Sequence, residues 1–404
     1  MRSLEAELES LVGAGAVRPA SPGEGNGPPG LVARPKTPEE LAAILAVADS
    51  RRLAVVVRGG GTKPAWGRAP SRCDVIVETT ALNRLLEHEP GDLTCVAQAG
   101  LRLGELQELV GQAPGHHQRL MLDPPQGGAS TLGGLVATAA SGPLRARYGT
   151  VRDLLLGARF ALADGTLART GGKVVKNVAG YDLGKLLTGS QGTLAVVVEV
   201  SLRLHPVAPA HQFVVGEGLG PGEAESFLNA LRRAPVTFSV AELLWPERLV
   251  LVRLDGTEAA CREQAGIVAR LLPHGRVAQP AESEGLAGLM SRRPWEGPGP
   301  VVGVAVPLSR VGELLELAAA GGPVAQLSLR GTVGAGEARL SAPSGLRWMA
   351  ERVEALGGFL HPHRWEGDAA PPLQPPDPAA ARLALAVKWA LDPHLTLAPG
   401  RGPA

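Results

Sequence analysis

The chain has 404 residues and a formal net charge of +1, with 45% hydrophobic and 20% charged residues, which is typical of a folded globular protein. A net charge so near zero gives no reason to expect binding to nucleic acid or to an anionic membrane surface. No apolar run approaches the length of a membrane span, and the charged N-terminus "MRSLEAELESLV" has no signal-peptide core. We expect a cytoplasmic protein, with attachment to the inner face of a membrane through a partner as an open alternative.

The three cysteines, Cys73, Cys95 and Cys261, are far apart in the sequence, and no C-x-x-C pair is present. This spacing argues against an iron–sulfur cluster or a structural zinc site within the chain. We therefore expect inert, buried thiols and no metal site.

The first predicted helix begins after Thr37, because Thr37-Pro38-Glu39-Glu40 has capping-box spacing and a proline at the first helical position. Strands are predicted at 53–57, 74–79 and 92–100, and a short helix at 103–110. The first strand ends in the glycine loop of "VVVRGGGTKPAWG" (55–67). Three consecutive glycines, which have no side chains, suit either a tight turn or a loop whose N–H groups surround an anion.

The stretch 127–150, "GGASTLGGLVATAASGPLRARYGT", is rich in small residues. Because glycine costs about 1 kcal/mol per helical position relative to alanine, we expect this stretch to be extended. A flat ligand can lie closely against such a segment. The alternative is a flexible linker, but Leu132, Leu135 and Val136 do not suit a solvated spacer.

A hairpin is predicted at 154–170 with Asp164-Gly165 as its turn, followed by a short helix at 182–187. A second glycine loop, Gly189–Gly192, leads into a long strand that ends near Pro206. Glycine loops thus fall repeatedly at the ends of predicted elements, which favours ligand binding over plain turns.

A different pattern begins after Pro206. Strands within 236–245, 248–256, 301–308, 324–331 and 336–342 alternate with helices at 258–272, 308–320 and 345–356. This alternation predicts a separate α+β domain at 209–367, built from two similar halves with an antiparallel sheet. The proline-rich stretch 367–380 is interpreted as a linker, and the remaining tail as a helix that ends in a turn.

Four stretches carry a family resemblance: "VVVRGGGTKPAWG", "TLGGLVATAASGPLRARYG", "KNVAGYDLGKLLTGSQGTLAVVVEVSLRLHP" and "LDPHLTLAPGRG". They resemble flavoproteins of the vanillyl-alcohol oxidase type, which share the PCMH-type FAD-binding domain. Within that group, "KNVAGYDLGKLLTGSQGTL" and "TTALNRLLEHEPGDLTCVAQAG" look most like the FAD-binding E subunits of bacterial glycolate oxidases. The resemblance covers nearly all of 30–206 in order, plus the tail.

The resemblance implies an α+β fold with three parts. A PCMH-type, two-subdomain FAD-binding domain would occupy 1–208, and a smaller α+β cap domain with an antiparallel sheet would occupy 209–367. The linker and C-terminal segment, 368–404, would return to the FAD-binding domain through Asp392-Pro393 and Pro399-Gly400.

The resemblance also implies where FAD would bind. The first glycine loop would meet the cofactor's diphosphate, and Pro125 with Thr131–Gly134 would form a second wall. Residues from Thr138 to Gly142 would lie beside the flavin ring, and Gly192 with the following strand would lie by the adenine and ribose. The expected cofactor-binding residues are Arg58, Gly59, Gly60, Gly61, Thr62, Pro125, Thr131, Leu132, Gly133, Gly134, Thr138, Ser141, Gly142, Tyr148, Gly149, Gly192, Val196, Val197 and Val198.

Departures from the family pattern refine these expectations. Flavin-linking members often carry a histidine where this chain has Thr62, so we expect non-covalent FAD. The H-x-G-D-G-N metal and substrate motif of the catalytic subunits is absent, and no catalytic residue can be assigned from spacing. The nearest cluster, His361-Pro362-His363 with Glu366 and Asp368, would put two rings on one face of a strand, but its prolines favour a solvated loop.

Two lysines, Lys173 and Lys176, lie beside "NVAGYD". They are expected on a solvated face, the alternative being contact with a phosphate or a partner.

The resemblance implies an FAD-binding subunit of a glycolate oxidase (glycolate dehydrogenase) complex, with a catalytic FAD-containing subunit and an iron–sulfur subunit as partners. Oxidation of a 2-hydroxy acid needs a base, a cation for the carboxylate and a hydride acceptor, and the sequence supports only the last of these. One alternative is a self-sufficient FAD-dependent dehydrogenase of glycolate or D-lactate. The other is a structural subunit that keeps the fold but uses no flavin in turnover.

Overall fold

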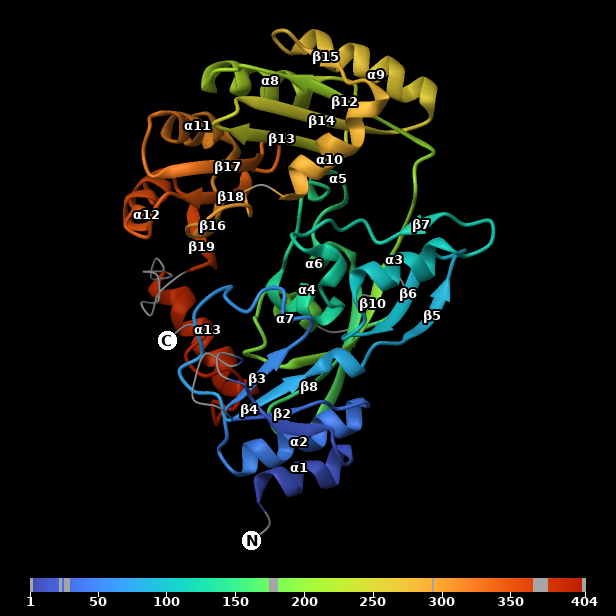
Figure 1. The fold of residues 1–404 in the computed structure, drawn as a ribbon, viewed down its shortest axis with the longest axis vertical. Helices are drawn as coiled ribbons and strands as arrows, with labels where there is room; N and C mark the ends of the chain where they lie inside the picture. Colours follow the sequence, from blue (N-terminus) through green and yellow to red (C-terminus); the bar gives the residue numbers. More distant parts are fainter. Residues whose placement is uncertain are drawn as a thin grey trace.

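The computed structural model describes residues 3–21, 24, 30–173, 181–292, 294–365 and 377–401. Two sheets occupy the lower half of the molecule in Figure 1, and a third, larger sheet backed by helices occupies the upper half. Mixed helices and largely antiparallel sheets confirm the predicted α+β class.

The first sheet has four strands in the order β1 (Val17–Pro19), β2 (Leu31–Ala33), β4 (Val75–Glu78) and β3 (Val55–Arg58). Strands β2, β4 and β3 are parallel, and β1 is antiparallel to β2. Helices α1 (Leu4–Val12) and α2 (Pro38–Ser50) pack against this sheet through a shared apolar core. The predicted cap at the start of α2 is confirmed, because the Thr37 hydroxyl accepts a hydrogen bond from the Glu40 N–H at 3.1 Å.

The second sheet has five antiparallel strands in the order β5 (Leu85–Glu89), β6 (Thr94–Gln98), β10 (Val196–Arg203), β8 (Leu155–Ala161) and β9 (Leu167–Gly171). The predicted hairpin between β8 and β9 is confirmed, with Gly165 at a φ of +86°. Its neighbours are α3 (Leu103–Gly111), α4 (Leu132–Thr138), α6 (Val151–Leu154), α7 (Leu183–Leu187), η1 (Thr79–Ala81) and the small pair β7 (Gln118–Arg119) with β11 (His205–Pro206).

The expectation that 127–150 is extended is wrong, because this segment contains η2 (Gly127–Ala129), α4 and α5 (Arg145–Tyr148). The Thr131 hydroxyl caps α4 by accepting from the Gly134 N–H at 3.3 Å. The apolar residues of α4 are buried against β10, and this burial offsets the cost of glycine in a helix. A Cβ on Gly133 would lie 2.8 Å from the Cβ of Ala99, so the glycine lets the helix approach that backbone closely.

The third sheet has eight antiparallel strands in the order β15 (Arg276–Val277), β12 (Ala210–Gly216), β14 (Leu249–Gly256), β13 (Val240–Trp245), β17 (Val324–Arg330), β18 (Ala335–Leu340), β16 (Val301–Ala305) and β19 (Phe359–Arg364). Each half runs strand, helix, strand, strand, helix, strand along the chain, and β13 pairs with β17 where the halves meet. The two similar halves expected from the sequence are therefore confirmed by the topology.

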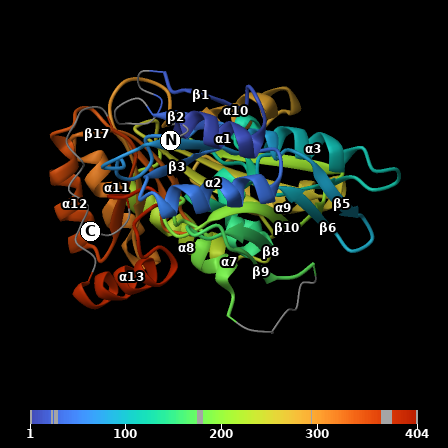
Figure 2. The ribbon, with the colours of Figure 1, turned by 90° about the horizontal axis from the view of Figure 1, so that it is seen from below.

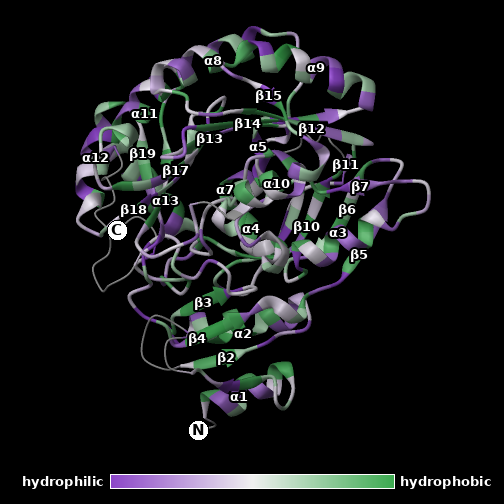
Figure 3. Cartoon of the chain, turned by 45° about the horizontal axis from the view of Figure 1, so that its top comes forward, coloured by the Kyte–Doolittle hydropathy of each residue, from purple (hydrophilic) through white to green (hydrophobic). Residues whose placement is uncertain are grey.

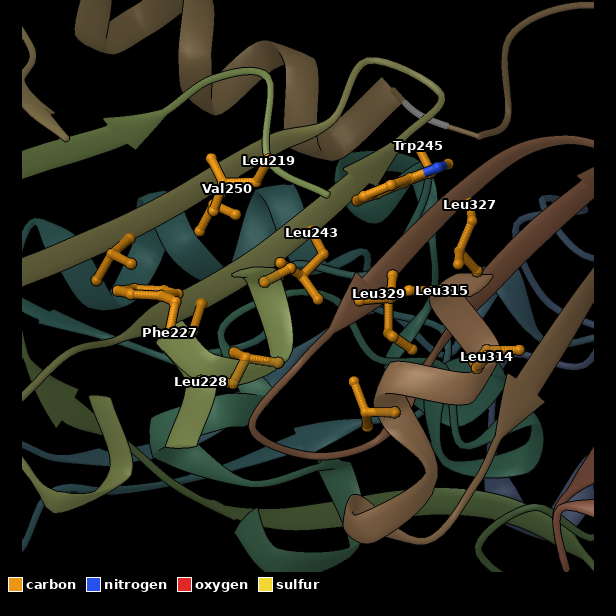
Figure 4. Close-up of a cluster of buried hydrophobic side chains, with 14 of the residues drawn as sticks. Leu219, Phe227, Leu228, Leu243, Trp245, Val250, Leu314, Leu315, Leu327 and Leu329 are labelled. Carbon is orange, nitrogen blue, oxygen red and sulfur yellow. The ribbon is translucent and has the colours of Figure 1, made fainter. Parts of the chain in front are cut away.

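The helices of this part are α8 (Pro221–Arg233), α9 (Glu258–Leu271), η3 (Pro280–Glu282), α10 (Ser283–Arg292), η4 (Leu308–Arg310), α11 (Val311–Ala319) and α12 (Gly345–Ala355). Helices α8, α9, α11 and α12 follow the outer side of the sheet (Figure 3). Figure 4 shows the apolar core between sheet and helices, with Leu243 of β13 and Leu329 of β17 near its centre.

The opposite face of the eight-stranded sheet turns toward the two smaller sheets. Along β13, Ala241, Leu243 and Trp245 belong to the helix-facing core, while Val240 and Leu244 pack with Leu144 and Tyr148 on the other side, as strand alternation requires. On β13, β17 and β18 the same inner face carries polar residues, which are Glu242, Ser328, Arg330, Glu337 and Arg339.

The expectation that His361-Pro362-His363 lies in a solvated loop is wrong. These residues form β19, which pairs with β16 at the edge of the sheet, and both imidazole rings are partly buried. An edge strand accommodates Pro362 because its missing N–H is not needed by a further strand. The other members of that cluster, Glu366 and Asp368, and most of the predicted linker lie outside the described residues.

The tail contains α13 (Pro378–Leu391), which lies on the outside of the molecule in both views (Figure 1, Figure 2). Cys73, Cys95 and Cys261 are buried and free, as expected. In the part of the chain that the structure describes, no helix combines the length and apolar character that a membrane crossing requires.

Candidate functional site

A cleft of about 230 Å³ lies between the four-stranded and the five-stranded sheets. One wall is the carboxyl end of β3 with the glycine loop that follows it. The other wall is α4, the loop before β10 and the start of β10. The two glycine loops and the glycine-rich helix thus come together around one cavity.

The first glycine loop packs so closely on the opposite wall that side chains cannot be accommodated. A Cβ on Gly59 would lie 2.1 Å from the Thr131 Oγ1, and one on Gly60 would lie 2.2 Å from the Ala129 carbonyl oxygen. The backbone N–H groups of Gly60 and Gly61 have no acceptor among the described residues. A loop that presents unpaired N–H donors to a cleft is suited to bind an anionic group.

Most of the expected cofactor-binding residues line this cleft. Those brought together are Arg58, Gly59, Gly60, Gly61, Thr62, Thr131, Gly133, Gly134, Thr138, Gly192, Val196 and Val197. Those that do not line it are Pro125, Leu132, Ser141, Gly142, Tyr148, Gly149 and Val198.

The expected residues outside the cleft have packing roles. Leu132 and Val198 are fully buried in the cores on the two sides of β10. The Ser141 hydroxyl accepts a hydrogen bond from Arg145, and the Tyr148 ring contacts His205 edge-on with centroids 5.0 Å apart. A Cβ on Gly142 would lie 1.9 Å from the Asp123 carbonyl oxygen.

The cleft contains residues that the sequence did not indicate, above all Lys63, Trp66, Gln191 and Arg401. Lys63 and Trp66 follow the first glycine loop closely in the sequence, and this position could have indicated that they line the cleft. Arg401 reaches the cleft from the opposite end of the chain, and only the fold brings it there.

Among the described residues three cations line the cleft, and they differ in their partners. Arg58 is paired with Glu24 at 2.9 Å and with Glu78 at 2.6 Å. Lys63 has no carboxylate partner among the described residues; its Nζ donates to the Ser130 hydroxyl at 2.6 Å, and burial lowers its pKa to about 8. Burial likewise lowers the pKa of Arg401.

Strand β19 contacts residues at the rim of the cleft from the side of the eight-stranded sheet. The His363 ring stacks on Trp66, and the Gly67 N–H donates to the Pro362 carbonyl oxygen at 2.9 Å. The His361 Nε2 lies 3.0 Å from the Gln191 side-chain nitrogen. Burial lowers the pKa of both histidines, that of His363 well below its usual value, so both are neutral at pH 7.

A charged cluster lies on the inner face of the sheet. Arg330 Nη1 lies 2.7 Å from Glu337 Oε2, and Arg330 Nε lies 3.7 Å from Glu242 Oε2. The Ser328 hydroxyl donates to Glu242, yet burial raises the pKa of Glu242 to about 7. The arginine is therefore held between two acidic side chains within a dry part of the molecule.

No group of three or more potential metal ligands occurs among the residues that the structure describes. Lys173 is exposed and paired with Glu87, which confirms the solvated face expected for it, while Lys176 lies outside the described residues.

Comparison with known proteins shows similarity to FAD-binding proteins. A family model described as an FAD binding domain matches residues 29–171. The D-lactate dehydrogenase of Archaeoglobus fulgidus is 36% identical over 178 residues, which cover 44% of this chain and 39% of that protein. Glycolate oxidase subunit GlcE of Escherichia coli is 31% identical over 223 residues, covering 54% of this chain and 61% of that subunit.

The fold also matches solved structures. The structure of p-cresol methylhydroxylase with bound substrate superposes with a TM-score of 0.73 at 17% identity, covering 98% of this chain and 95% of that one. The match to the sequence relatives is partial, because it covers 39% of the D-lactate dehydrogenase and 61% of GlcE.

Proposed function

This chain is an FAD-binding protein with a PCMH-type fold, and from this premise we propose that it is the FAD-binding subunit of a glycolate oxidase complex. In this proposal it is an FAD-dependent oxidoreductase subunit, and the complex oxidises glycolate to glyoxylate and passes electrons through flavin to an iron–sulfur partner. The proposed partners are a catalytic FAD-containing subunit and the iron–sulfur subunit. The similarity to GlcE, of which 61% is matched, supports this role.

The residues of the cleft fit the cofactor. The N–H groups of Gly60 and Gly61, which have no acceptor among the described residues, would hold its diphosphate, and the small residues of α4 would allow close approach to the backbone. Trp66 lines the cleft and is held in place by its stacking on His363. When bound, FAD supplies the acceptor of a hydride equivalent. Thr62 cannot form a histidyl link, so the cofactor is held without a covalent bond.

The pairing of Arg330 is the observation that supports FAD binding by this chain and substrate binding by a partner. Oxidation of a 2-hydroxy acid needs a cation that holds the substrate's carboxylate. Arg330 is the buried arginine on the inner face of the sheet, but Glu337 is bound to it and Glu242 lies close by. A carboxylate substrate would meet two acidic groups there and would have to displace one of them. This supports a chain that holds FAD while a partner holds the substrate.

A second candidate function is a self-sufficient FAD-dependent dehydrogenase of glycolate or D-lactate. The observation that favours it is the pair of neutral imidazoles, His361 and His363, which contact the cleft residues Gln191 and Trp66. Among the residues that the structure describes, the Nδ1 atoms of both rings have no hydrogen-bond partner, and a neutral imidazole can accept the hydroxyl proton of a substrate.

An anaerobic absorption spectrum of the chain, before and after adding glycolate or D-lactate, separates the two candidates. For a subunit, the flavin band stays until the catalytic flavoprotein subunit is added. Bleaching by the isolated chain would instead establish the self-sufficient dehydrogenase. If a reconstituted complex with an FAD-free version of this chain keeps full activity, the chain has a structural role only.

A further inference from the structure

The C-terminal tail is anchored by a buried ion pair. Lys388, on α13, contacts the Asp392 carboxylate and donates to the carbonyl oxygens of Thr193 at 2.6 Å and Leu397 at 2.9 Å. The Asp392 carboxylate in turn accepts from the N–H groups of Thr396 and Leu397, both at 2.8 Å. Such a closed network fixes the position of the residues that follow it, because every buried polar group in it has a partner.

From this anchor the tail continues along the edge of the four-stranded sheet. The Val55 N–H donates to the Thr396 carbonyl oxygen at 2.7 Å, and the Ala398 N–H donates to Val55 at 2.8 Å. Leu397 is fully buried between them. The Ser71 N–H then donates to the Pro399 carbonyl oxygen at 2.7 Å. The tail therefore runs beside β3, whose end carries the first glycine loop, and arrives at the cleft.

Arg401 is the residue that the tail brings into the cleft. Its Nε donates to the Arg68 carbonyl oxygen at 3.0 Å and its Nη2 to the Pro64 carbonyl oxygen at 2.9 Å. These bonds orient the guanidinium group and use two of its five N–H donors. Among the described residues no carboxylate is paired with it, in contrast to Arg58 in the same cleft.

Two partly buried cations, Lys63 and Arg401, therefore line one cleft with the N–H groups of the glycine loop, and none of these groups has an anionic partner within the described part of the chain. Removing such charges from water is unfavourable unless an anion compensates them. We propose that the tail is an integral wall of the FAD site, and that Arg401, together with Lys63, forms a charged contact with the diphosphate of the dinucleotide. The Lys388–Asp392 pair positions Arg401 for this contact.

Titration of the apoprotein with FAD and with ADP, which carries the diphosphate but no flavin, tests the proposal. Arg401→Met is expected to weaken binding of both ligands by about 10- to 100-fold, and Arg401→Lys by less, because the charge is kept. The matched control is Arg347→Met, since the Arg347 side chain is 85% exposed and lies in a surface ion pair on α12. It should change both affinities by less than about twofold.

Unchanged ADP affinity in Arg401→Met overturns the proposal, whether or not FAD affinity falls, because Arg401 would then act on the flavin or on packing alone. These binding measurements involve no glycolate, so they are independent of the proposed function.

A second measurement tests the coupling between tail and ligand. If Arg401 contacts the diphosphate, ADP must stabilise the docked tail, since binding and docking are thermodynamically linked. Hydrogen exchange at the Leu397 and Ala398 amides should slow when ADP is added to the wild-type protein and should not respond to ADP in Arg401→Met. If the exchange rates of these amides in the wild type do not change when ADP is added, the proposal is contradicted.

Discussion

The indole ring of Trp66 lies flat on the imidazole ring of His363, with centroids 3.8 Å apart and planes 6° apart. Trp66 follows the first glycine loop, and His363 belongs to the last strand of the eight-stranded sheet. A third ring, Trp295, is nearly parallel to both. This stack joins the cofactor cleft to the large sheet, so the two parts of the molecule depend on each other for stability.

Removing the ring from this stack should destabilise the fold. Trp66 is 6% exposed, and Trp66→Ala is expected to lower the free energy of unfolding by about 3 kcal/mol or more, because it leaves a cavity and removes the stacked contact. Denaturant unfolding measures the change. Trp389→Ala on α13 is the control, since its 53% exposed ring should matter by less than about 1 kcal/mol. Equal effects of the two substitutions would show that the stack does not stabilise the fold.

A methyl group on the glycine loop should abolish cofactor binding. Gly60→Ala would bring a Cβ within 2.2 Å of the Ala129 carbonyl oxygen and force the loop away from the opposite wall. We expect the flavin absorbance per protein to fall at least tenfold. Gly128→Ala is the matched control, because no atom lies within 4 Å of the added Cβ. The loop assignment fails if Gly60→Ala retains its flavin, and circular dichroism checks that the variant is folded.

Cofactor affinity should decrease at alkaline pH. Lys63 has a pKa lowered to about 8 by burial, and it faces the Ser130 hydroxyl, the Trp66 ring and His363, which is neutral in this range. Bound diphosphate favours the charged amine and raises its pKa. Affinity for FAD is therefore constant below about pH 7 and falls by up to about tenfold per pH unit above pH 8. Fluorescence titration measures this. Lys63→Met should bind more weakly at pH 7 and lose the pH dependence, and an identical profile would exclude Lys63 from the contact.

The buried carboxyl of Glu242 should give stability an unusual pH dependence. Its pKa rises from 4.5 to about 7 because it is buried, so the folded state holds a proton that the unfolded state loses at lower pH. Stability therefore falls as pH rises from about 4.5 to 7 and then levels off, with a total on the order of 3 kcal/mol at most. Glu242→Gln can still accept a hydrogen bond from Ser328 but has no proton to lose. The variant should therefore lose less stability than the wild type between pH 5 and pH 8. Thermal melts of both proteins at pH 5 and pH 8 measure this difference. An equal change in melting temperature for the two proteins would contradict the prediction.

The flavin should be released when the protein is denatured. Thr62 stands where a histidyl link would form, so acid precipitation is expected to leave the yellow colour in the supernatant. Colour that stays with the pellet would reveal a covalent link through another residue.

Features set by neighbouring residues were predictable from the sequence. The cap at Thr37 and the turn at Asp164-Gly165 depend on a few adjacent residues, and both form as expected. The order of the glycine loops, together with the family resemblance, pointed to most of the residues that line the cleft. The division of the large sheet into two halves also followed from the alternation of strands and helices.

Features set by distant contacts were not predictable. Helix α4 forms despite its glycines because its apolar residues pack on β10, and helix propensity contains no information about that packing. His361 and His363 are ordered because β16 pairs with their strand and Trp66 stacks on one ring. Arg401 enters the cleft through a tail that is held by Thr193 and Val55, far away in the sequence.

The pairing of β13 with β17 has a consequence for how the large sheet finds its register. No hairpin joins these strands, so no turn fixes which residues face each other; in the structure Glu242 lies opposite Arg330 and Leu243 opposite Leu329. A slip of one residue would turn Arg330 toward the apolar helices and Leu329 toward the acidic cluster. The alternation of charged and apolar side chains along β13 and β17 therefore specifies the register in which the two halves of the sheet pair.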